Sequence, residues 1–357
     1  MTWIWPQKNW PHFSYKSIFE LDEKFVQNAG ILTGLQEILD DSVLMNIKIE
    51  QLSEEAFRTS EIEGELLNRD SVKLSIRKNI QKQEINWNLK ENNIAAVVVD
   101  AQNSVEEPLS QNLLFRWYKM LMKNRHDLLN AEGFRTHQDA MQIVSTATGE
   151  VYYEAPPSKQ VPEEMKIFID WFNSSKELSP LVRAGIAHLH FVMIHPFEDG
   201  NGRISRLLAE KALAQYLKRP LTISISAAIQ KNRKKYYDAL EQANHSIEID
   251  NWLQYFAETV IEAQENLKKI VKFTVKKSSF YNKFGNFLNE RQKKAITTIF
   301  KYGSFEFVGG MSAEKYIAIT GTSRATATRD LNDLVEKGIM IKSGERRYAR
   351  YQLNQKF

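Results

Sequence analysis

The stretch Pro180–Ile194 most constrains the fold, because its side chains are apolar on nearly every side when they are placed on a helix. Such a helix is stable in water only when other elements cover it all round. Most of the first 270 residues show the 3.6-residue periodicity that predicts further helices. We therefore expect a mainly α protein built around one central helix. The expected helices are 17–39, 44–61, one from about 70, 94–105, 109–122, 160–173, 180–194 and 205–217.

One stretch breaks the helical pattern. Between residues 141 and 153, runs of β-branched and aromatic side chains flank Thr148 and Gly149, and Pro156-Pro157 follows. This arrangement predicts a β-hairpin. A hairpin that stands alone in a helical protein has two unpaired edges. Other parts of the protein must cover these edges, or a partner must bind to them.

The composition limits the class of protein. The chain has 357 residues, 43% of them hydrophobic and 26% charged, so two or three domains are expected. It has no cysteine, which excludes disulfides, thiolate metal sites and cysteine nucleophiles and fits a reducing compartment. The sequence has no apolar run of membrane-spanning length and does not start with a signal-peptide pattern. We expect a cytoplasmic protein that does not contact a membrane.

The net charge of +4 is unevenly distributed. Residues 271–357 contain 17 Lys and Arg against 7 Asp and Glu, whereas the first 270 residues contain 31 against 37. The sequence also becomes lysine-rich and loses clear periodicity over 268–285. We expect an N-terminal helical extension (1–85), a central helical domain (86–270) and a basic C-terminal domain (271–357). The charge of the tail favours nucleic acid as its partner and fits a solvated lysine-rich surface equally well.

The C-terminal domain has the element order of a winged helix-turn-helix. Expected helices at 290–302, 312–319 and 324–337 precede a hairpin at 339–353 that turns at Ser343-Gly344. The helix 324–337 has the composition of a recognition helix, and residues 345–350 would give the wing a basic tip. The candidate DNA contacts are Arg324, Thr326, Thr328 and Arg329. Because winged helices also dock proteins or dimerise, both kinds of partner stay open.

The run His195-Pro-Phe-Glu-Asp-Gly-Asn-Gly-Arg-Ile-Ser-Arg206 connects the central apolar helix to an amphipathic one. Its Gly200-Asn201-Gly202 turn lets backbone N–H groups approach an anion, and the following helix adds the positive end of its dipole. Arg203 and Arg206 lie three residues apart on that helix, so both can reach phosphate oxygens. The pattern indicates a site for a di- or triphosphate.

Two side chains beside this turn supply the remaining chemistry. Asp199 offers hard oxygen ligands next to the phosphates and is suited to Mg²⁺. His195 ends the preceding helix and can take a proton from an incoming hydroxyl. A base, a metal ligand and an anion site are together what phosphoryl or nucleotidyl transfer requires.

The whole run resembles the Fic family signature, His-x-Phe-x-(Asp/Glu)-Gly-Asn-Gly-Arg-x-x-Arg, and matches every specified position. The resemblance implies a Fic-type helical bundle with a β-hairpin flap. It also implies transfer of AMP from ATP to a Ser, Thr or Tyr hydroxyl of a target protein, and of the protein itself. In this family His195 would be the base, Asp199 the Mg²⁺ ligand and Phe197 a core anchor. The residues that it places at the ATP are Glu63, Ile143, Val144, Ser145, Gly200, Asn201, Gly202, Arg203, Arg206, Tyr237 and Asn244.

Three further segments agree with the resemblance. The hairpin at 142–153 lies upstream of the motif, as the family's flap does, and its edge would bind the target segment by β-augmentation. Thr59-Ser-Glu-Ile-Glu63-Gly64 resembles an inhibitory motif whose glutamate pairs with the second motif arginine, here Arg206. A capped helix end explains this hexapeptide as well. The tryptophan-rich start, residues 3–13, resembles an N-terminal extension that we expect to pack on the helical core.

Several alternatives stay open. A transcriptional regulator whose Fic core senses nucleotide would not need the base and metal ligand, so their presence favours a transferase. A hydrolase that removes AMP would use Glu63 to position water. A kinase-like reaction is disfavoured because Gly202 and Arg203 are retained. His188 and His190, as an i, i+2 pair, point to different sides of a helix and are expected in the core rather than at a zinc ion. A homodimer through apolar helix faces is a further option.

Overall fold

The computed structural model describes residues 3–354, apart from 85, 124, 145–148, 150, 221 and 302–308 and apart from the side chains of residues 301 and 347. The chain divides into two compact units. The first unit comprises residues 1–31 and 40–266, and the second comprises 32–39 and 267–357. The division falls within two helices, α1 (Phe19–Glu37) and α11 (Asp250–Phe284).

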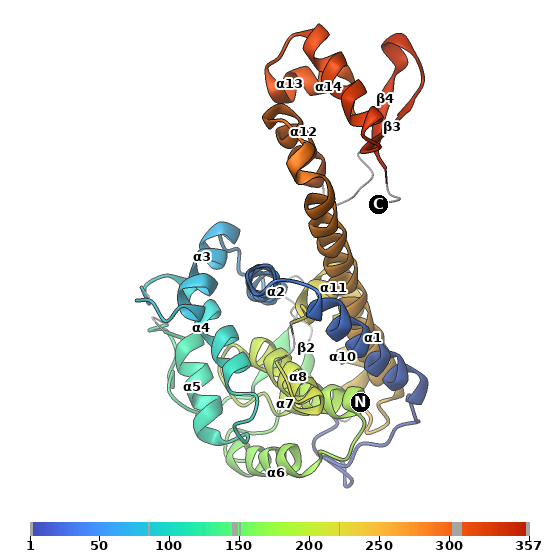
Figure 1. Ribbon diagram of the computed structural model, residues 1–357. Coiled ribbons are helices and arrows are strands. Elements are labelled where there is room, and N and C mark those ends of the chain that lie inside the picture. Colours follow the sequence, from blue (N-terminus) through green and yellow to red (C-terminus); the bar gives the residue numbers. More distant parts are fainter. Residues whose placement is uncertain are drawn as a thin grey trace. The chain divides into compact units, whose positions relative to one another are not determined.

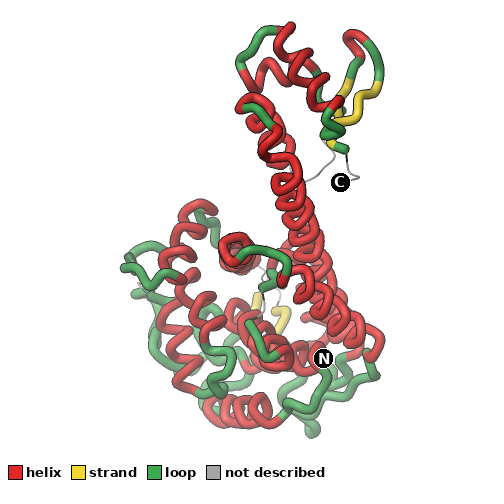
Figure 2. Tube along the Cα trace, viewed as in Figure 1, coloured by secondary structure: helices red, strands yellow, loops and turns green. Residues whose placement is uncertain are grey.

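The first unit is mainly helical, as the sequence predicts, and its strands are short (Figures 1 and 2). Each expected helix is present, and its ends lie within a few residues of the predicted ones. Besides α1 and α11, the helices are α2 (Asp41–Ile62), α3 (Arg69–Ile80), α4 (Lys90–Asn103), α5 (Gln111–Leu121), α6 (Val161–Ser174), α7 (Pro180–Ile194), α8 (Asn201–Leu217), α9 (Ile225–Lys231) and α10 (Arg233–Ala243).

Local sequence explains where several of these helices begin. The side chains of Asn68 and Ser110 each accept a hydrogen bond from the backbone N–H three residues later, which caps α3 and α5. Prolines occupy the first turn of α6 and α7, where a missing N–H costs nothing. Helix α8 begins at Asn201, four residues before the expected start at 205. The prediction was wrong here because the glycine-rich turn already belongs to the helix.

Helix α7 is the central helix that the sequence predicts. All of its residues are buried. It lies very close to α11 at Gly185, where a Cβ would collide with Leu253. The indole N–H of Trp252 donates to the Gly185 carbonyl, 2.9 Å away. The absence of a side chain at Gly185 therefore lets the two helices pack in direct contact.

The predicted hairpin is formed by β1 (Gln142–Val144) and β2 (Val151–Glu154), which pair antiparallel. The hydroxyl of Tyr153 donates to the carbonyl of Met193, so β2 is attached to the end of α7. The tryptophan-rich start packs against the same region. The indole of Trp5 donates to the Glu154 carbonyl, and the ring of Trp3 packs edge-on against Tyr153.

The second unit has its own core. Its elements after α11 are a 3-10 turn (Gly285–Phe287), α12 (Glu290–Lys301), α13 (Ala313–Thr320), α14 (Arg324–Glu336), β3 (Met340–Ser343), a 3-10 turn (Arg346–Tyr348) and β4 (Arg350–Leu353). β3 and β4 pair antiparallel, and Met311 forms a bridge to Tyr351 of β4. The lysine-rich stretch 268–285 is mostly helical, as the second half of α11. Its weak periodicity did not indicate this, although Phe280 is buried in the core of the unit.

None of the helices described is long and apolar enough to cross a lipid bilayer.

Candidate functional site

The candidate site is the loop between α7 and α8. His195 ends α7 with a φ of 50°, and Gly200 precedes α8 with a φ of 79°, so both lie in the left-handed region. The positive φ of Gly200 favours glycine, and a Cβ there would also displace the side-chain ends of Leu121 and Met122. The side chain of Asn201 accepts from the N–H of Phe197 and donates to its carbonyl. The side-chain amide of Asn201 therefore stabilises the loop, and the backbone of Asn201 is left to bind a ligand.

Phe197 anchors the loop in the core, as the resemblance implies. Its side chain is fully buried and stacks on Tyr118 with 4.1 Å between ring centroids. The rings of Phe115, Phe134 and Phe191 surround it. Because the anchor lies two residues after His195, it fixes the histidine backbone relative to the start of α8.

The imidazole of His195 is neutral, and one of its two nitrogens has a defined partner. Its Nδ1 lies 3.2 Å from the carbonyl of Val192. Since a carbonyl only accepts, Nδ1 carries the proton and Nε2 keeps its lone pair. Burial lowers the pKa of His195 to about 4, although the Val192 hydrogen bond, Glu63 and Asp199 act in the opposite direction. The ring is therefore unprotonated at neutral pH and can accept a proton.

Arg135 fixes this part of the backbone, and no sequence pattern pointed to it. Its Nε donates to the carbonyl of His195 at 2.8 Å, and its guanidinium also donates to Ser158 Oγ and to the Pro156 carbonyl. Burial lowers the pKa of Arg135 to about 10, so it stays charged at neutral pH. Arg135 thus connects the backbone of His195 to the segment that follows β2.

Asp199 lies at the N-terminus of α8 and is ionised. Its Oδ1 accepts from the Gly200 N–H at 2.6 Å and lies 3.2 Å from Arg203 Nη2, while its Oδ2 accepts from Arg125 Nη1 at 2.6 Å. Burial would raise the pKa of this carboxyl, but Arg203 and Arg125 outweigh it and keep the pKa below its usual range. Arg125 is a second site residue that the sequence did not reveal.

Each of the two motif arginines forms an ion pair with an acidic residue that lies at or just after the C-terminal end of α2. Arg206 is fully buried, and its Nη2 lies 2.6 Å from Glu63 Oε1. Its Nε donates to Thr59 Oγ1 at 2.8 Å. Arg203 donates to Glu65 Oε2 at 2.9 Å. The sequence predicted the Glu63–Arg206 contact through the resemblance, but it did not single out Glu65.

Glu63 lies over the turn where phosphates are expected. A Cβ at Gly202 would collide with Glu63 Oε1 and would lie 3.2 Å from Arg206 Nη1. Among the residues described, this Nη1 has no hydrogen-bond partner, although it is buried. The first backbone N–H groups of α8 also lack acceptors within the helix. Glu63 therefore lies among several donors that suit an anion.

The carboxylate oxygens of Asp199 suit a Mg²⁺ ion that arrives with a nucleotide. Among the described residues, no three His, Cys, Asp or Glu side chains are grouped to hold a metal by themselves. Mg²⁺ commonly takes one or two protein carboxylates and completes its shell with substrate phosphates and water. The single ionised carboxylate of Asp199, beside an anion site, has the matching chemistry. Arg125 would have to release Oδ2 if the ion used that oxygen.

The other predicted nucleotide contacts are distributed around the loop. The hydroxyl of Tyr237 donates to the carbonyl of Ile62, next to Glu63, at 3.2 Å, and burial raises the pKa of this tyrosine. The amide of Asn244 donates to the Tyr152 carbonyl at 2.8 Å, so it supports the hairpin. Ile143 and Val144 are exposed on β1. Ser145 lies outside the described residues.

His188 and His190 lie in the core, as expected. The Nε2 of His188 pairs with the hydroxyl of Tyr236 at 2.9 Å. His190 packs edge-on against Trp10, Phe13 and Phe168, and burial lowers its pKa to about 3. Both imidazoles therefore support the packing around α7.

The four candidate DNA contacts belong to the second unit and lie on α14. Arg324, Thr328 and Arg329 are exposed, whereas Thr326 is half-buried near the Ser323 cap. Arg324 pairs with Glu314 at 3.0 Å. The C-terminal half of the helix is acidic, because it contains Asp330, Asp333 and Glu336.

The chain was compared with known families and proteins. Residues 108–213 match the Fic/DOC family, and residues 3–81 match a domain of unknown function (DUF4172). Protein adenylyltransferase fic-1 from Caenorhabditis elegans is 37% identical over 86 residues, which are 24% of this chain and 16% of the relative. A probable protein adenylyltransferase from Aquifex aeolicus is 27% identical over 143 residues, which are 40% of this chain and 39% of the relative. The matched stretches thus span less than two fifths of these relatives.

Two solved structures share the fold. A Fic family protein from Desulfovibrio desulfuricans has a TM-score of 0.53 at 18% identity, with 94% of this chain and 97% of that chain covered. A Fic domain containing signaling protein from Bacteroides thetaiotaomicron has a TM-score of 0.55 at 22% identity, with coverage of 70% and 97%. At these identities the likeness concerns the fold alone.

Proposed function

Because the chain is a Fic-family protein, we propose that it transfers AMP from ATP to a side-chain hydroxyl of a target protein and of itself. The observation that carries the proposal is the state of His195. Its imidazole is neutral, and Nε2 is the nitrogen that keeps a lone pair. His195 lies five residues before Gly200, which caps α8, and the N-terminus of α8 suits phosphates. A protein that only senses nucleotide would not need such a base.

In the proposed reaction the hydroxyl oxygen of the target attacks the α-phosphorus of ATP. The hydroxyl proton passes to Nε2 of His195 as the new O–P bond forms. The bond from the α-phosphorus to the bridging oxygen breaks, and pyrophosphate leaves with the electron pair. The N-terminus of α8 stabilises negative charge on the phosphates, and Arg206 holds the terminal phosphate. A Mg²⁺ ion at Asp199 would neutralise phosphate charge when it is bound.

We further propose that Glu63 inhibits the enzyme from within the chain. Its carboxylate is bound to Arg206 and lies against Gly202, where phosphate oxygens would have to be. Since Arg206 is fully buried, its charge is poorly screened by water, and the Glu63 carboxylate competes with a phosphate for its Nη2. ATP would bind productively only after Glu63 has moved away.

The free edge of β1 is the proposed binding place for the target. The carbonyl of Glu154 points away from β1, because the N–H of Ala155 points toward it and bonds to Met141. The carbonyl of Tyr152 lies two residues earlier, where the pairing register shifts. Asn244 and Trp5 already donate to these two carbonyls, so the outer edge of β2 is covered. A target strand would therefore add to β1, which is exposed, and Tyr153 attaches this hairpin near His195.

The position of the label in ATP tests the reaction. We expect the purified protein to become labelled covalently from ATP that carries the label on the α-phosphate. ATP that carries the label on the γ-phosphate should leave no label, because that phosphate departs in pyrophosphate. Parallel reactions with α-labelled GTP, UTP and CTP would identify the nucleotide. Labelling from the γ-position alone would refute AMP transfer and favour a kinase.

For the second unit we propose a winged helix-turn-helix that binds DNA with the N-terminal half of α14. This half has two exposed arginines, Arg324 and Arg329, and no acidic residue before Asp330. We expect the double variant Arg324→Ala/Arg329→Ala to lose salt-dependent binding of duplex DNA in fluorescence anisotropy. Lys293→Ala/Lys294→Ala on α12 is the charge-matched control and should retain binding. Equal DNA binding by both double variants would contradict the proposal that α14 binds DNA.

A further inference from the structure

A cavity of about 250 Å³ lies beside Arg203 in the first unit. Leu121 and Met122 form part of its wall, and their side chains fill the space that a Cβ at Gly200 would occupy, so the cavity adjoins the loop between α7 and α8. Four cationic side chains line it against a single acidic one. These charged residues are Lys90, Lys123, Arg125, Arg203 and Glu65.

Glu65 holds two of these cations together. Its Oε1 lies 3.0 Å from Lys90 Nζ, and its Oε2 lies 2.9 Å from Arg203 Nη1. The carboxylate thus bridges the two cations as a bound anion would. Lys123 has no ion-pair partner among the residues that the structure describes, although it is exposed at the edge of the cavity.

Two buried side chains of the cavity have polar atoms without a partner. Within the described part of the chain, Nε of Arg203 and Oδ1 of Asn93 have no hydrogen bond. Arg203 is only 6% exposed and Asn93 only 3%. A buried donor without a partner costs free energy, so a ligand or an ordered water is expected to engage it. An anion would suit Arg203, and a hydroxyl or a water bound to that anion would suit Asn93.

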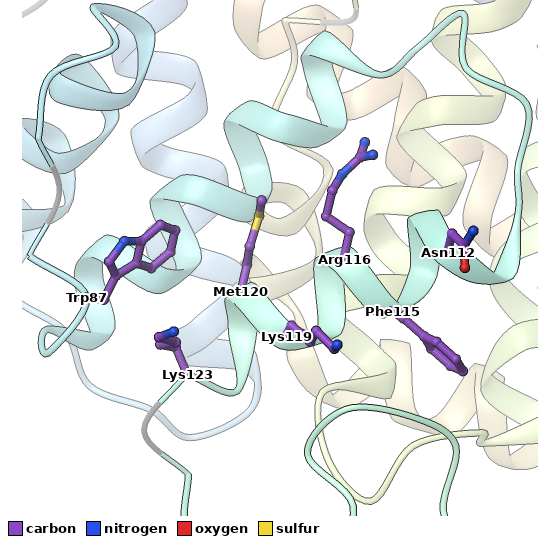
Figure 3. A pocket seen from close by; sticks show the side chains of 7 residues that line it. All are labelled: Trp87, Asn112, Phe115, Arg116, Lys119, Met120 and Lys123. Atoms are coloured by element: carbon purple, nitrogen blue, oxygen red, sulfur yellow. The ribbon is translucent and has the colours of Figure 1, made fainter.

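A neighbouring groove allows the charges that line the two hollows to be compared. The face of α5 has a more open groove of about 460 Å³, which is lined by Lys119 on the helix and by Lys123 just beyond its end (Figure 3). There Arg116 is neutralised by Asp100 and Glu107, and Lys119 lies 3.4 Å from Glu132. In the smaller cavity Arg125 is likewise paired with Asp127 and Asp199, so Lys123, which lines both hollows, is the cation that has no ion pair among the described residues. Lys119 provides a matched control for Lys123 because its charge is paired with Glu132.

We propose that the cavity beside Arg203 is a binding site for a small polyvalent anion of the phosphate class, which displaces Glu65 from Arg203. Pyrophosphate fits this description and is the leaving group of the proposed reaction. That identification rests on the proposed AMP transfer, whereas the anion site itself does not. A free metabolite with two phosphate groups has the same chemistry, so the experiment must separate the two sources.

The test uses the full chain with His195→Ala as a common background, so that binding is measured without turnover. Pyrophosphate is titrated calorimetrically in the absence of divalent metal. We expect Lys123→Ala to weaken binding about tenfold, because one charge-assisted contact is lost. Glu65→Gln should tighten binding by a similar factor, since the internal competitor loses its charge. Lys119→Ala should change the dissociation constant by less than about twofold.

Two results would overturn the site. The first is unchanged binding in Lys123→Ala. The second is binding that Arg206→Ala abolishes while Lys123→Ala and Glu65→Gln have no effect, which would place pyrophosphate in the nucleotide site.

Orthophosphate and a sugar bisphosphate are titrated in parallel. Preference for pyrophosphate supports the leaving-group assignment, and preference for the bisphosphate overturns that assignment while it supports the anion site. Because no transfer is measured, failure of the proposed reaction would leave these outcomes interpretable.

Discussion

The variant His195→Ala is expected to lose AMP transfer by at least about a hundredfold, because a positioned general base contributes 10² to 10⁴ in rate. In the native protein the Nδ1–H bond to Val192 leaves Nε2 free, and burial keeps the ring neutral, so it is ready to accept the hydroxyl proton. Alanine removes the acceptor. The anion site of α8 and the two motif arginines would stay in place. Covalent labelling from α-labelled ATP measures the effect.

Binding of a non-hydrolysable ATP analogue is the control for this variant. It should change little, because in the described part of the chain no hydrogen bond or ion pair joins His195 to Arg203 or Arg206. If His195→Ala binds the analogue normally and still transfers AMP at the native rate, His195 is not the base. Loss of both binding and transfer would instead indicate that the loop has been disrupted.

The variant Glu63→Gly is expected to raise self-labelling about tenfold or more. The carboxylate that competes for Arg206 disappears, and the space over Gly202 becomes free for phosphate oxygens. A hydrogen bond to a charged group contributes about 1.5–3 kcal/mol, and about 1.4 kcal/mol corresponds to a tenfold change in an equilibrium constant. The initial rate of label incorporation at an ATP concentration well below saturation is the quantity to compare.

Glu61→Gly is the matched control for Glu63→Gly. It introduces the same residue and the same charge change in the last turn of α2, but the Glu61 carboxylate pairs with Arg58 and not with a motif arginine. Its labelling rate should stay close to that of the native protein. An equal increase in both variants would mean that loosening the helix end, and not release of Arg206, activates the protein. A fall in labelling of Glu63→Gly, with slower removal of AMP from a modified target, would favour the hydrolase.

The sequence allowed prediction of those parts of the fold that depend on local pattern. Helix α7 has the predicted bounds because its residues are apolar on all sides, and Pro180 marks its start. The hairpin was predicted from its residue types, and β1 and β2 lie where they were expected. The start of α8 was placed too late, since the bonds from Asn201 to Phe197 that close the turn are a property of the folded loop. The lysine-rich half of α11 is helical because it packs into a core that the local pattern did not reveal.

The site was predictable only as far as its residues belong to a recognisable motif. Arg135, Arg125 and Glu65 stand in unremarkable sequence, and each reaches the loop from a distant part of the chain. Their roles arise from buried charges that the fold brings together, and spacing along the chain does not encode such contacts. Asn201 shows the opposite case, because its motif position suggested ligand binding while its side chain braces the loop.

The central claim has two parts. Arg206 binds either Glu63 or the terminal phosphate of ATP, and His195 accepts the hydroxyl proton once Arg206 has bound the phosphate. The most direct measurement compares covalent labelling from α-labelled ATP by Glu63→Gly and by Glu63→Gly/His195→Ala. We predict strong labelling of the single variant and none above background for the double variant. Labelling of the double variant at the rate of the single one would contradict the account.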